Sequence, residues 1–412
     1  MPLSLTGVTM IDGTGREPVP DATVTIEGNV TTSAGAAPPR TGQDVLDLSG
    51  LTLLPGLIDL HTHMGLVSAN DAAALSPAMT AALLFQNAEL CLRSGHTSAR
   101  EVAGADGALR EVIDTGVIPG PRLFPSGPIL CQTGGHGDRG ALYYPSILNH
   151  QHSGIPGLAQ MSVTCDGPDS VRIAARQAFR RGATQIKLCI SGGVVSLTDR
   201  LEDTQFNVAE MRAAVEEAQA RDSYVTAHAH NSRAINTGLD AGLECFEHGT
   251  FLDEATASRM AQTGAALVPT LTVTHLMATQ WREWQLPEAI LPRLAGVEQA
   301  MMASLKLAHD AGVIIGSGTD LLGPRQDRRG LEIALKAKVL GPMAAIVSAT
   351  SASAAILRQP DLGTIAEGKL ADLIAVSGDP LGDPGLFDDP DRVVLVIKDG
   401  KIMKDLTSVN AR

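Results

Sequence analysis

Two histidines, His61 and His63, have the residue type and spacing of metal ligands. They end a short apolar segment in the stretch LPGLIDLHTHMG, which spans residues 54–65. In a strand, residues i and i+2 point to the same face, so both imidazoles should project from one side where the strand enters a loop. Two converging imidazoles form half of a metal site, although this pair alone fits an ordinary strand end equally well.

Further ligand types fall at the ends of other apolar segments. His228 and His230 close one such segment, His248 closes the next, and Asp320 follows GSGT after a later one. Lys187 lies within the segment QIKLCI. Imidazole and carboxylate ligands suit zinc or a similar divalent ion. The recurrence of these residue types at strand ends favours a metal site over a set of unrelated polar residues.

Lys187 is the unusual member of this set. A charged ammonium group cannot coordinate a metal ion and would be repelled by it. The lysine fits as a neutral amine, as a more distant substrate contact, or as a carbamate formed with CO2, whose anionic oxygens could bridge two ions. Taken alone, a lysine in a strand fits a solvated strand end just as well. Beside the other candidate ligands, we favour the metal-site interpretation.

A carboxylate at Asp320 could both bind metal and move a proton. A bound divalent ion lowers the pKa of its water, so that hydroxide is available near neutral pH. A carboxylate at the metal could take the proton of that water. The alternative is an aspartate that merely caps the turn after Gly-Thr.

Eight predicted strand-then-helix units carry these residues. Their number and alternation predict an α/β fold, a (β/α)8 TIM barrel over residues 57–358. Such barrels place functional side chains at the C-terminal ends of their strands, which is where the candidate ligands fall. The expected strands lie at residues 57–60, 98–101, 122–124, 185–190, 224–228, 245–248, 266–269 and 313–316.

Both ends of the chain are rich in short predicted strands and lack helical periodicity. In the C-terminal segment, Asp399-Gly400 joins two such strands and is a strong hairpin signal. We expect residues 1–56 and 359–412 to pair into one small, discontinuous β-sandwich domain. The expected strands of this domain lie at residues 8–11, 22–26, 44–48, 371–376 and 393–397.

Composition limits the functional classes. The 412 residues suffice for one large and one smaller domain, and the net charge of −13 argues against nucleic acid or an anionic membrane as the main partner. Five scattered cysteines without a CxxC motif favour a reducing compartment. The sequence shows no leader pattern at its start and no apolar run of roughly 18 residues. We therefore expect a cytoplasmic protein that acts on a small molecule.

The motifs occur in a familiar order. HTH after LPGLID, IK in the fourth predicted strand, HAH in the fifth, EHG in the sixth and GTD in the eighth resemble those of the amidohydrolase superfamily. The resemblance spans almost the whole chain. CQTGGHGD at 131–138 and VTAHAHN at 225–231 are most similar to the imidazolonepropionase-like branch. Within it, the chain resembles the binuclear Xaa-Pro and Xaa-Arg dipeptidases and the ochratoxin-type amide hydrolases.

This resemblance implies a centre of two divalent metal ions, with zinc as the expected ion, and a homo-oligomeric enzyme. One ion would be bound by His61, His63, Asp320 and carbamylated Lys187. The same carbamate would hold the second ion together with two further histidines, and a hydroxide would bridge the ions. The implied ligands are His61, His63, Lys187, His228, His248 and Asp320. In such a centre one ion would polarise the scissile carbonyl, and Asp320 would orient the hydroxide, take its proton and deliver it to the leaving amine.

Two histidines remain for catalysis or substrate binding. His230 shares a strand face with His228, and His136 lies in the glycine-rich loop GGHGD. Either could hydrogen-bond the scissile carbonyl oxygen or a substrate carboxylate, although His136 fits an inconsequential loop residue equally well. Tyr143 and Tyr144 could line the same mouth.

An arginine-rich segment, LLGPRQDRRG, follows Asp320 and contains Arg325, Arg328 and Arg329. Such a charge run is usually a solvated face, but one arginine, with Arg325 and Arg328 as the candidates, could grip an anionic group of the substrate. Relatives often carry a histidine in this loop. In their second strand they carry GxTT followed by arginine and aspartate, where this chain has GHTSARE with the unusual His96. Substrate preferences therefore do not transfer directly.

We expect a binuclear amidohydrolase that cleaves an amide or peptide bond in a dipeptide or an N-acyl or aryl-acyl amino acid, as a dipeptidase, carboxypeptidase or prolidase does. The alternatives on the same barrel are a cyclic-amide or imide hydrolase, a carbamate hydrolase and a deaminase. Lys187 argues against a mononuclear deaminase, which does not need it. An inactive scaffold is a remote alternative, because the full ligand set is retained.

Overall fold

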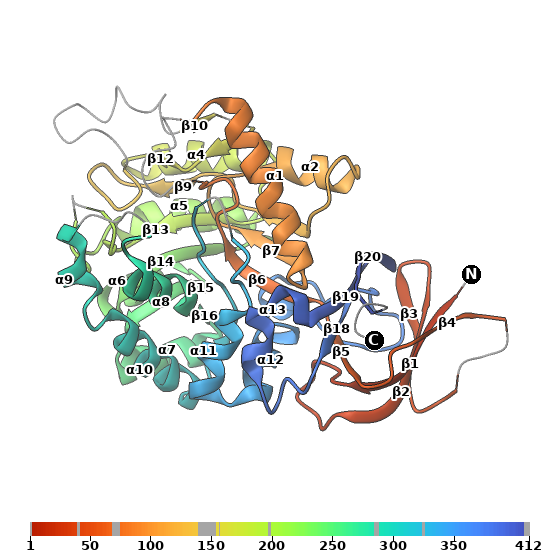
Figure 1. Cartoon of the computed structure of the whole chain (residues 1–412). Helices are drawn as coiled ribbons and strands as arrows, with labels where there is room; N and C mark the ends of the chain where they lie inside the picture. Colours follow the sequence, from red (N-terminus) through yellow and green to blue (C-terminus); the bar gives the residue numbers. More distant parts are fainter. Residues whose placement is uncertain are drawn as a thin grey trace.

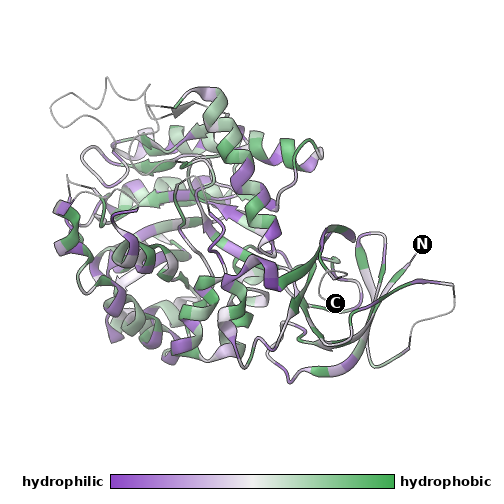
Figure 2. Cartoon of the chain, viewed as in Figure 1, coloured by the Kyte–Doolittle hydropathy of each residue, from purple (hydrophilic) through white to green (hydrophobic). Residues whose placement is uncertain are grey.

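The computed structural model describes residues 2–38, 42–67, 75–138, 154, 155, 157–196, 199–283, 288–323 and 326–407. It shows a large α/β body and a smaller β body, and both termini belong to the smaller one (Figure 1). Hydrophobic and hydrophilic residues alternate around the helices of the large body, as expected for helices that cover a core with one face (Figure 2). Among the described residues, no helix is long and apolar enough to cross a bilayer.

The small body is one eight-stranded sheet in the order β20-β19-β18-β5-β1-β2-β3, with β4 paired to β1. Its two halves come from opposite ends of the chain and meet where β5 pairs antiparallel with β18, with Leu53 opposite Ala375. The strands are β1 (Leu3–Met10), β2 (Val19–Glu27), β3 (Val30–Gly35), β4 (Asp44–Asp47), β5 (Leu51–Pro55), β18 (Leu373–Ser377), β19 (Val393–Lys398) and β20 (Lys401–Asp405).

The large body contains two parallel sheets, one in the order β6-β7-β8 and one in the order β12-β9-β13-β14-β15-β16-β17. A separate pair, β10 with β11, is antiparallel. The strands are β6 (Leu57–Thr62), β7 (His96–Glu101), β8 (Arg122–Pro125), β9 (Ile129–Cys131), β10 (Gly154–Ile155), β11 (Ala159–Gln160), β12 (Ser162–Thr164), β13 (Ile186–Cys189), β14 (Val225–Asn231), β15 (Cys245–Phe251), β16 (Ala266–Val268) and β17 (Ile314–Ile315).

Backbone hydrogen bonds connect the edges of the two parallel sheets. Leu60 N donates to Ser317 O at 2.7 Å, which links β6 to the segment after β17. Thr184 N donates to Pro125 O at 2.7 Å, which links the end of β8 to the start of β13. All eight strands expected for the large domain are present. The short strands β9 and β12 were not predicted, because three-residue segments give too little periodicity to recognise.

Helices follow most of the parallel strands and pack outside them (Figure 1). The core between them is built largely from alanine, valine, isoleucine and leucine. The helices are α1 (Pro77–Arg93), α2 (Gly107–Asp114), α4 (Pro168–Arg180), α5 (Val208–Gln219), α6 (Ser232–Ala241), α7 (Glu254–Thr263), α8 (Leu271–Gln280), α9 (Leu291–Leu294), α10 (Val297–Asp310), α11 (Leu331–Leu340), α12 (Pro342–Ser348) and α13 (Ser351–Ile356), with the 3₁₀ helices η2 (Glu288–Ile290), η3 (Pro384–Asp388) and η4 (Pro390–Arg392).

Candidate metal centre

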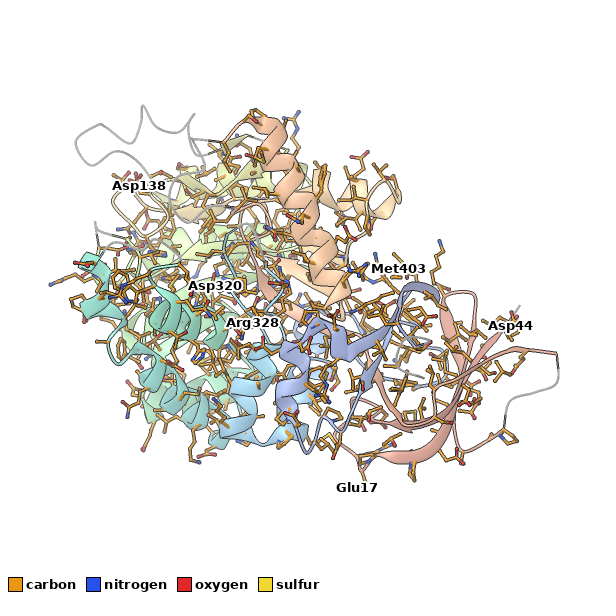
Figure 3. All side chains as sticks on the ribbon, in the orientation of Figure 1. Glu17, Asp44, Asp138, Asp320, Arg328 and Met403 are labelled. Atoms are coloured by element: carbon orange, nitrogen blue, oxygen red, sulfur yellow. The ribbon has the colours of Figure 1, made fainter. Side chains whose placement is uncertain are left out.

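The candidate ligands converge at the C-terminal ends of the parallel strands. Asp320 lies in the interior of the large body, just beyond β17 (Figure 3). Its backbone N donates to His61 O at 2.8 Å, so the loop after β17 follows the end of β6. Gly318 permits this approach, because a Cβ there would lie 2.6 Å from the Cβ of His61. The glycine of the GTD motif is thus required by packing.

A first group of ligand atoms comes from His61, His63 and Asp320. The two Nε2 atoms lie 3.2 Å apart. Asp320 Oδ1 lies 3.0 Å from His63 Nε2 and 3.5 Å from His61 Nε2. Both histidines are buried, whereas the Asp320 side chain keeps 18% of its exposure, so the carboxylate lies on the solvent side of the group. The three ligand atoms lie within 4.8 Å of one another, and their types match the donor set of a small divalent cation.

A second group comes from His228, His230 and His248, whose ligand atoms lie within 4.8 Å of one another. The rings of His61 and His248 have centroids 5.1 Å apart, which brings the two groups together. His230, which we considered for substrate binding, is therefore placed within a group that could also hold a metal ion. His248 and Asp320 both have positive φ angles, +67° and +56°, which is uncommon for residues other than glycine.

In every one of these histidines, one ring nitrogen contacts a fixed partner outside the two groups. This arrangement leaves the other nitrogen available to coordinate a metal ion, as is usual for histidines that bind metal. The contacts are His61 Nδ1 to Glu247 Oε2 (2.7 Å), His63 Nδ1 to Ala103 O (3.0 Å), His228 Nε2 to Gly192 O (3.1 Å), His230 Nδ1 to Thr250 Oγ1 (2.7 Å) and His248 Nδ1 to Thr270 Oγ1 (2.6 Å).

Lys187 lies beside both groups, in β13. Its side chain is buried and its Nζ atom has no hydrogen-bond partner in the described part of the chain. Burial lowers the pKa of this amine. A buried amine without a hydrogen-bond partner is costly, so such a group calls for an explanation. A neutral amine that acquires a partner in the working enzyme would provide one. A carbamate on Lys187 would remove the unsatisfied group and add anionic oxygens, so the residues present fit a centre of divalent cations.

Burial and neighbouring charges keep most of the rings neutral. Burial and then Lys187 lower the pKa of His61 to about 4, and burial lowers that of His230 to about 4. For His63, burial is outweighed by the hydrogen bond and charge of Asp320, which raise its pKa. Burial would raise the pKa of Asp320, but His61 and His63 lower it, so the carboxylate is ionised at neutral pH. Neutral imidazole and ionised carboxylate are the forms that bind metal.

His136 is also brought to the centre. Its ring stacks on that of His228, with centroids 4.3 Å apart and an angle of 15° between the planes. Gly193 makes room for it, since a Cβ at that position would lie 2.2 Å from His136 Cε1. The backbone N of His136 donates to Gln205 Oε1 at 3.0 Å, which fixes the loop. His136 is therefore well placed to contact a substrate.

The arginines of the segment after Asp320 differ in burial and in ion-pair partner. Arg329, expected on a solvated face, is fully buried and pairs with Asp59 at 2.6 Å, which corrects that expectation. Arg328 makes two hydrogen bonds to Asp388, of 2.6 and 2.5 Å, rather than to either ligand group. Arg325, Tyr143 and Tyr144 lie outside the described residues.

Two buried ion pairs beside the ligands were missed by the sequence analysis. Asp59 accepts from Arg329 and also from the backbone N of His61 at 3.1 Å. Glu247 pairs with Arg100 at 2.6 Å while it contacts His61. A signal existed for Asp59, which lies two residues before His61 and therefore on the same strand face.

Comparison with known proteins agrees with this geometry. The model of the amidohydrolase family matches residues 52–403. The chain belongs to the amidohydrolase family. Amidohydrolases are generally metal-dependent, and the two ligand groups are the candidate metal sites of this member.

Its relatives include amide and peptide hydrolases. Ochratoxinase of Aspergillus niger is 32% identical over 364 residues, which cover 85% of this chain and 75% of the relative. A prolidase solved with N-methylphosphonate-L-proline has a TM-score of 0.92 and 36% identity, covering 98% of this chain and all of the other. A Xaa-Pro dipeptidase solved with methionine in its active site has a TM-score of 0.87 and 31% identity, with coverage of 98% and 100%. This amidohydrolase is a hydrolase that acts on amide bonds.

Proposed function

We propose that this amidohydrolase uses two divalent metal ions, expected to be zinc, to cleave an amide bond whose amine side is an amino acid. The substrate would be a dipeptide or an N-acyl or aryl-acyl amino acid, including ochratoxin-type amides. The observation that carries the proposal is the buried, unpaired amine of Lys187 beside two groups of ligand atoms. A mononuclear site would have no use for that amine.

The fold supports this proposal if the parallel sheets form one closed barrel. The hydrogen bonds between Leu60 and Ser317 and between Thr184 and Pro125 are those expected where such a barrel closes. We propose a (β/α)8 barrel over residues 57–358 and a β-sandwich-like domain from residues 1–56 and 359–412. The ligands would then lie at the C-terminal mouth of the barrel, where substrates enter.

Each ligand has a proposed place. His61, His63 and Asp320 would hold one ion, and His228 and His248 the other. A carbamate on Lys187 would supply an oxygen to each. His230 belongs to the same group as His228 and His248, and its Nδ1 atom is held by Thr250. It could therefore act either as a ligand of the second ion or as a substrate contact.

The bound ions would activate a water molecule and polarise the scissile carbonyl. Asp320 is the proton carrier of this chain, because it is ionised, partly exposed and 3.0 Å from His63 Nε2. It would take a proton from the attacking water and deliver it to the leaving nitrogen. His136 and His230 would hydrogen-bond the substrate, one at the carbonyl oxygen and one at the carboxylate.

The relatives support an amino-acid leaving group. The prolidase was solved with a phosphonate of L-proline, and the dipeptidase with methionine. Both ligands carry a free carboxylate beside the nitrogen or amino group. An enzyme that shares this preference would need a cation or hydrogen-bond donors at the mouth, and His136 and His230 are the described candidates.

A hydrolysis panel on zinc-loaded protein tests the proposal. Dipeptides and N-acyl amino acids with a free C-terminal carboxylate are compared with the same compounds amidated. We expect cleavage of the free acids only. Cleavage of neither series by protein with two bound ions would overturn the proposed substrate class and direct attention to cyclic amides, carbamates and deamination. Light scattering of the same sample would test the expected homo-oligomer.

A further inference from the structure

Glu247 occupies an enclosed position in β15, directly behind His61. Its side chain is fully buried. One carboxylate oxygen, Oε2, lies 2.7 Å from His61 Nδ1. The other, Oε1, accepts from Arg100 Nη2 at 2.6 Å and from the hydroxyl of Thr226. Glu247 therefore contacts a proposed ligand through one oxygen and a fixed set of donors through the other.

Arg100 cannot turn away from Glu247. Its Nε donates to Leu60 O at 2.7 Å and its Nη1 to Tyr224 Oη at 3.1 Å, and its side chain is fully buried. Arginine only donates hydrogen bonds, so Oε1 of Glu247 must be an acceptor. Because Glu247 forms a buried ion pair with the Arg100 guanidinium, it is an ionised carboxylate and has only an acceptor to offer at Oε2 as well. The proton between Glu247 and His61 must therefore belong to His61 Nδ1.

The consequence for His61 is a defined tautomer. With the proton on Nδ1, a neutral imidazole has its lone pair on Nε2. This is the atom that lies 3.2 Å from His63 Nε2 and 3.5 Å from Asp320 Oδ1. In the other four histidines of the centre, the nitrogen that is held by a partner outside the two groups has a carbonyl or a hydroxyl as its hydrogen-bond partner. A hydroxyl can donate or accept and so does not fix the tautomer by itself.

We propose that Glu247 is a positioning residue that holds His61 in its Nδ1–H tautomer and so presents the Nε2 lone pair to the metal. This inference rests on the proposed function for the identity of the ligand, but the tautomer is a property of the metal-free protein. The carboxylate also orients the ring, since Arg100 and Thr226 hold Glu247 in place through its other oxygen, Oε1.

Replacing the carboxylate by an amide gives a sharp test. In Glu247→Gln, Arg100 still requires an acceptor, so the amide oxygen should face Arg100 and the amide NH2 should face His61. His61 Nδ1 must then accept, and its proton moves to Nε2, where it blocks metal binding. Carboxylates that hydrogen-bond a metal-binding histidine typically contribute about 10- to 100-fold to metal affinity.

The experiment combines ¹⁵N NMR of the imidazole nitrogens in metal-free protein with zinc titration against a competing chelator. The His61 signals are assigned by their loss in His61→Asn. We expect the Nδ1–H tautomer in the unmodified chain, the Nε2–H tautomer in Glu247→Gln, and a zinc dissociation constant raised about 10- to 100-fold in that variant. Glu332→Gln removes another buried carboxylate, which contacts Thr272 rather than a histidine of the centre, and should change neither readout.

Two results would overturn the inference. One is an Nε2–H or doubly protonated His61 in the unmodified, metal-free chain, a measurement that does not depend on the folding of Glu247→Gln. The other is a Glu247→Gln protein that binds zinc as tightly as the unmodified chain. Neither result depends on hydrolysis, so an enzyme that fails the substrate panel could still confirm the role of Glu247.

Discussion

The Nε2 atoms of His61 and His63 lie 3.2 Å apart, and Asp320 Oδ1 lies within 3.5 Å of both. Glu247 and the carbonyl of Ala103 accept hydrogen bonds from the two Nδ1–H groups. Two imidazole lone pairs and a carboxylate oxygen then face one another, and such an arrangement needs a positive charge between them. A proton on His63 can supply it in the metal-free chain, and a divalent ion can supply it in the loaded one.

Metal removal should therefore destabilise the protein. A ligand present at 1,000 times its dissociation constant stabilises the folded state by about 4 kcal/mol, so zinc should raise the Tm by several degrees. Scanning calorimetry of chelator-treated protein, with and without added zinc, measures the shift. Magnesium at the same concentration is the control, because it prefers oxygen ligands. An unchanged Tm with zinc would contradict the proposed centre.

Lys187→Ala should remove the shared ligand of the two ions. We expect zinc content to fall below two per chain and kcat to fall more than about 100-fold, since loss of a ligand exceeds the effect of losing a residue that supports one. Elemental analysis and steady-state kinetics measure the two effects. Lys336→Ala is the matched control, because Lys336 is also buried but contacts Gly316 O and Ser348. A Lys187→Ala protein that keeps two ions would exclude the carbamate.

Asp320→Asn should leave the fold intact and lower kcat by about 10²- to 10⁴-fold, because an amide cannot carry the proton to the leaving nitrogen. KM should change much less, since the proposed substrate contacts are His136 and His230. Asp388→Asn is the control, since Asp388 pairs with Arg328 rather than with the ligand groups. Near-normal turnover in Asp320→Asn would remove this residue as proton carrier.

The sequence was more informative about the candidate ligands, which the structure brings together, than about the residues that support them. HTH and HAH can be recognised because side chains alternate along a strand, and all eight strands that we predicted for the large domain are present. Arg329 was not readable, because a run of arginines is usually solvated, and its partner Asp59 lies 270 positions away in the chain. Glu247 was likewise hidden, because its role depends on Arg100 in another strand. Support of this kind is a property of tertiary packing and has no local signal.

Arg329 and Arg328 should differ strongly in their effect on stability. Arg329→Met leaves Asp59 as an uncompensated buried charge, which typically costs about 3–5 kcal/mol. Arg328→Met removes a partly exposed ion pair, for which about 0–1 kcal/mol is expected. Urea denaturation monitored by circular dichroism compares the two variants. Equal losses of unfolding free energy would show that the buried pair contributes no more to stability than the partly exposed one.

His96 should make the fold sensitive to mild acid. Burial lowers its pKa from 6.5 to about 4, and its Nδ1 atom lies 3.1 Å from Ser94 Oγ. In the unfolded chain this histidine titrates near its ordinary value, so between pH 6.5 and 4 the unfolded state binds more protons. The resulting stability is therefore present above about pH 6.5 and lost as the pH falls, by about 1.4 kcal/mol per pH unit.

His96→Gln should remove that dependence. The difference in unfolding free energy between the unmodified chain and the variant should shrink from pH 7 to pH 5, by about 2 kcal/mol if the shift is fully expressed. Urea titrations in the presence of chelator measure it, because proton binding by the metal ligands is then common to both proteins. A difference for His96→Gln that stays constant with pH would mean that folding does not change the pKa of His96, contrary to its burial and to the nearby charge of Arg329.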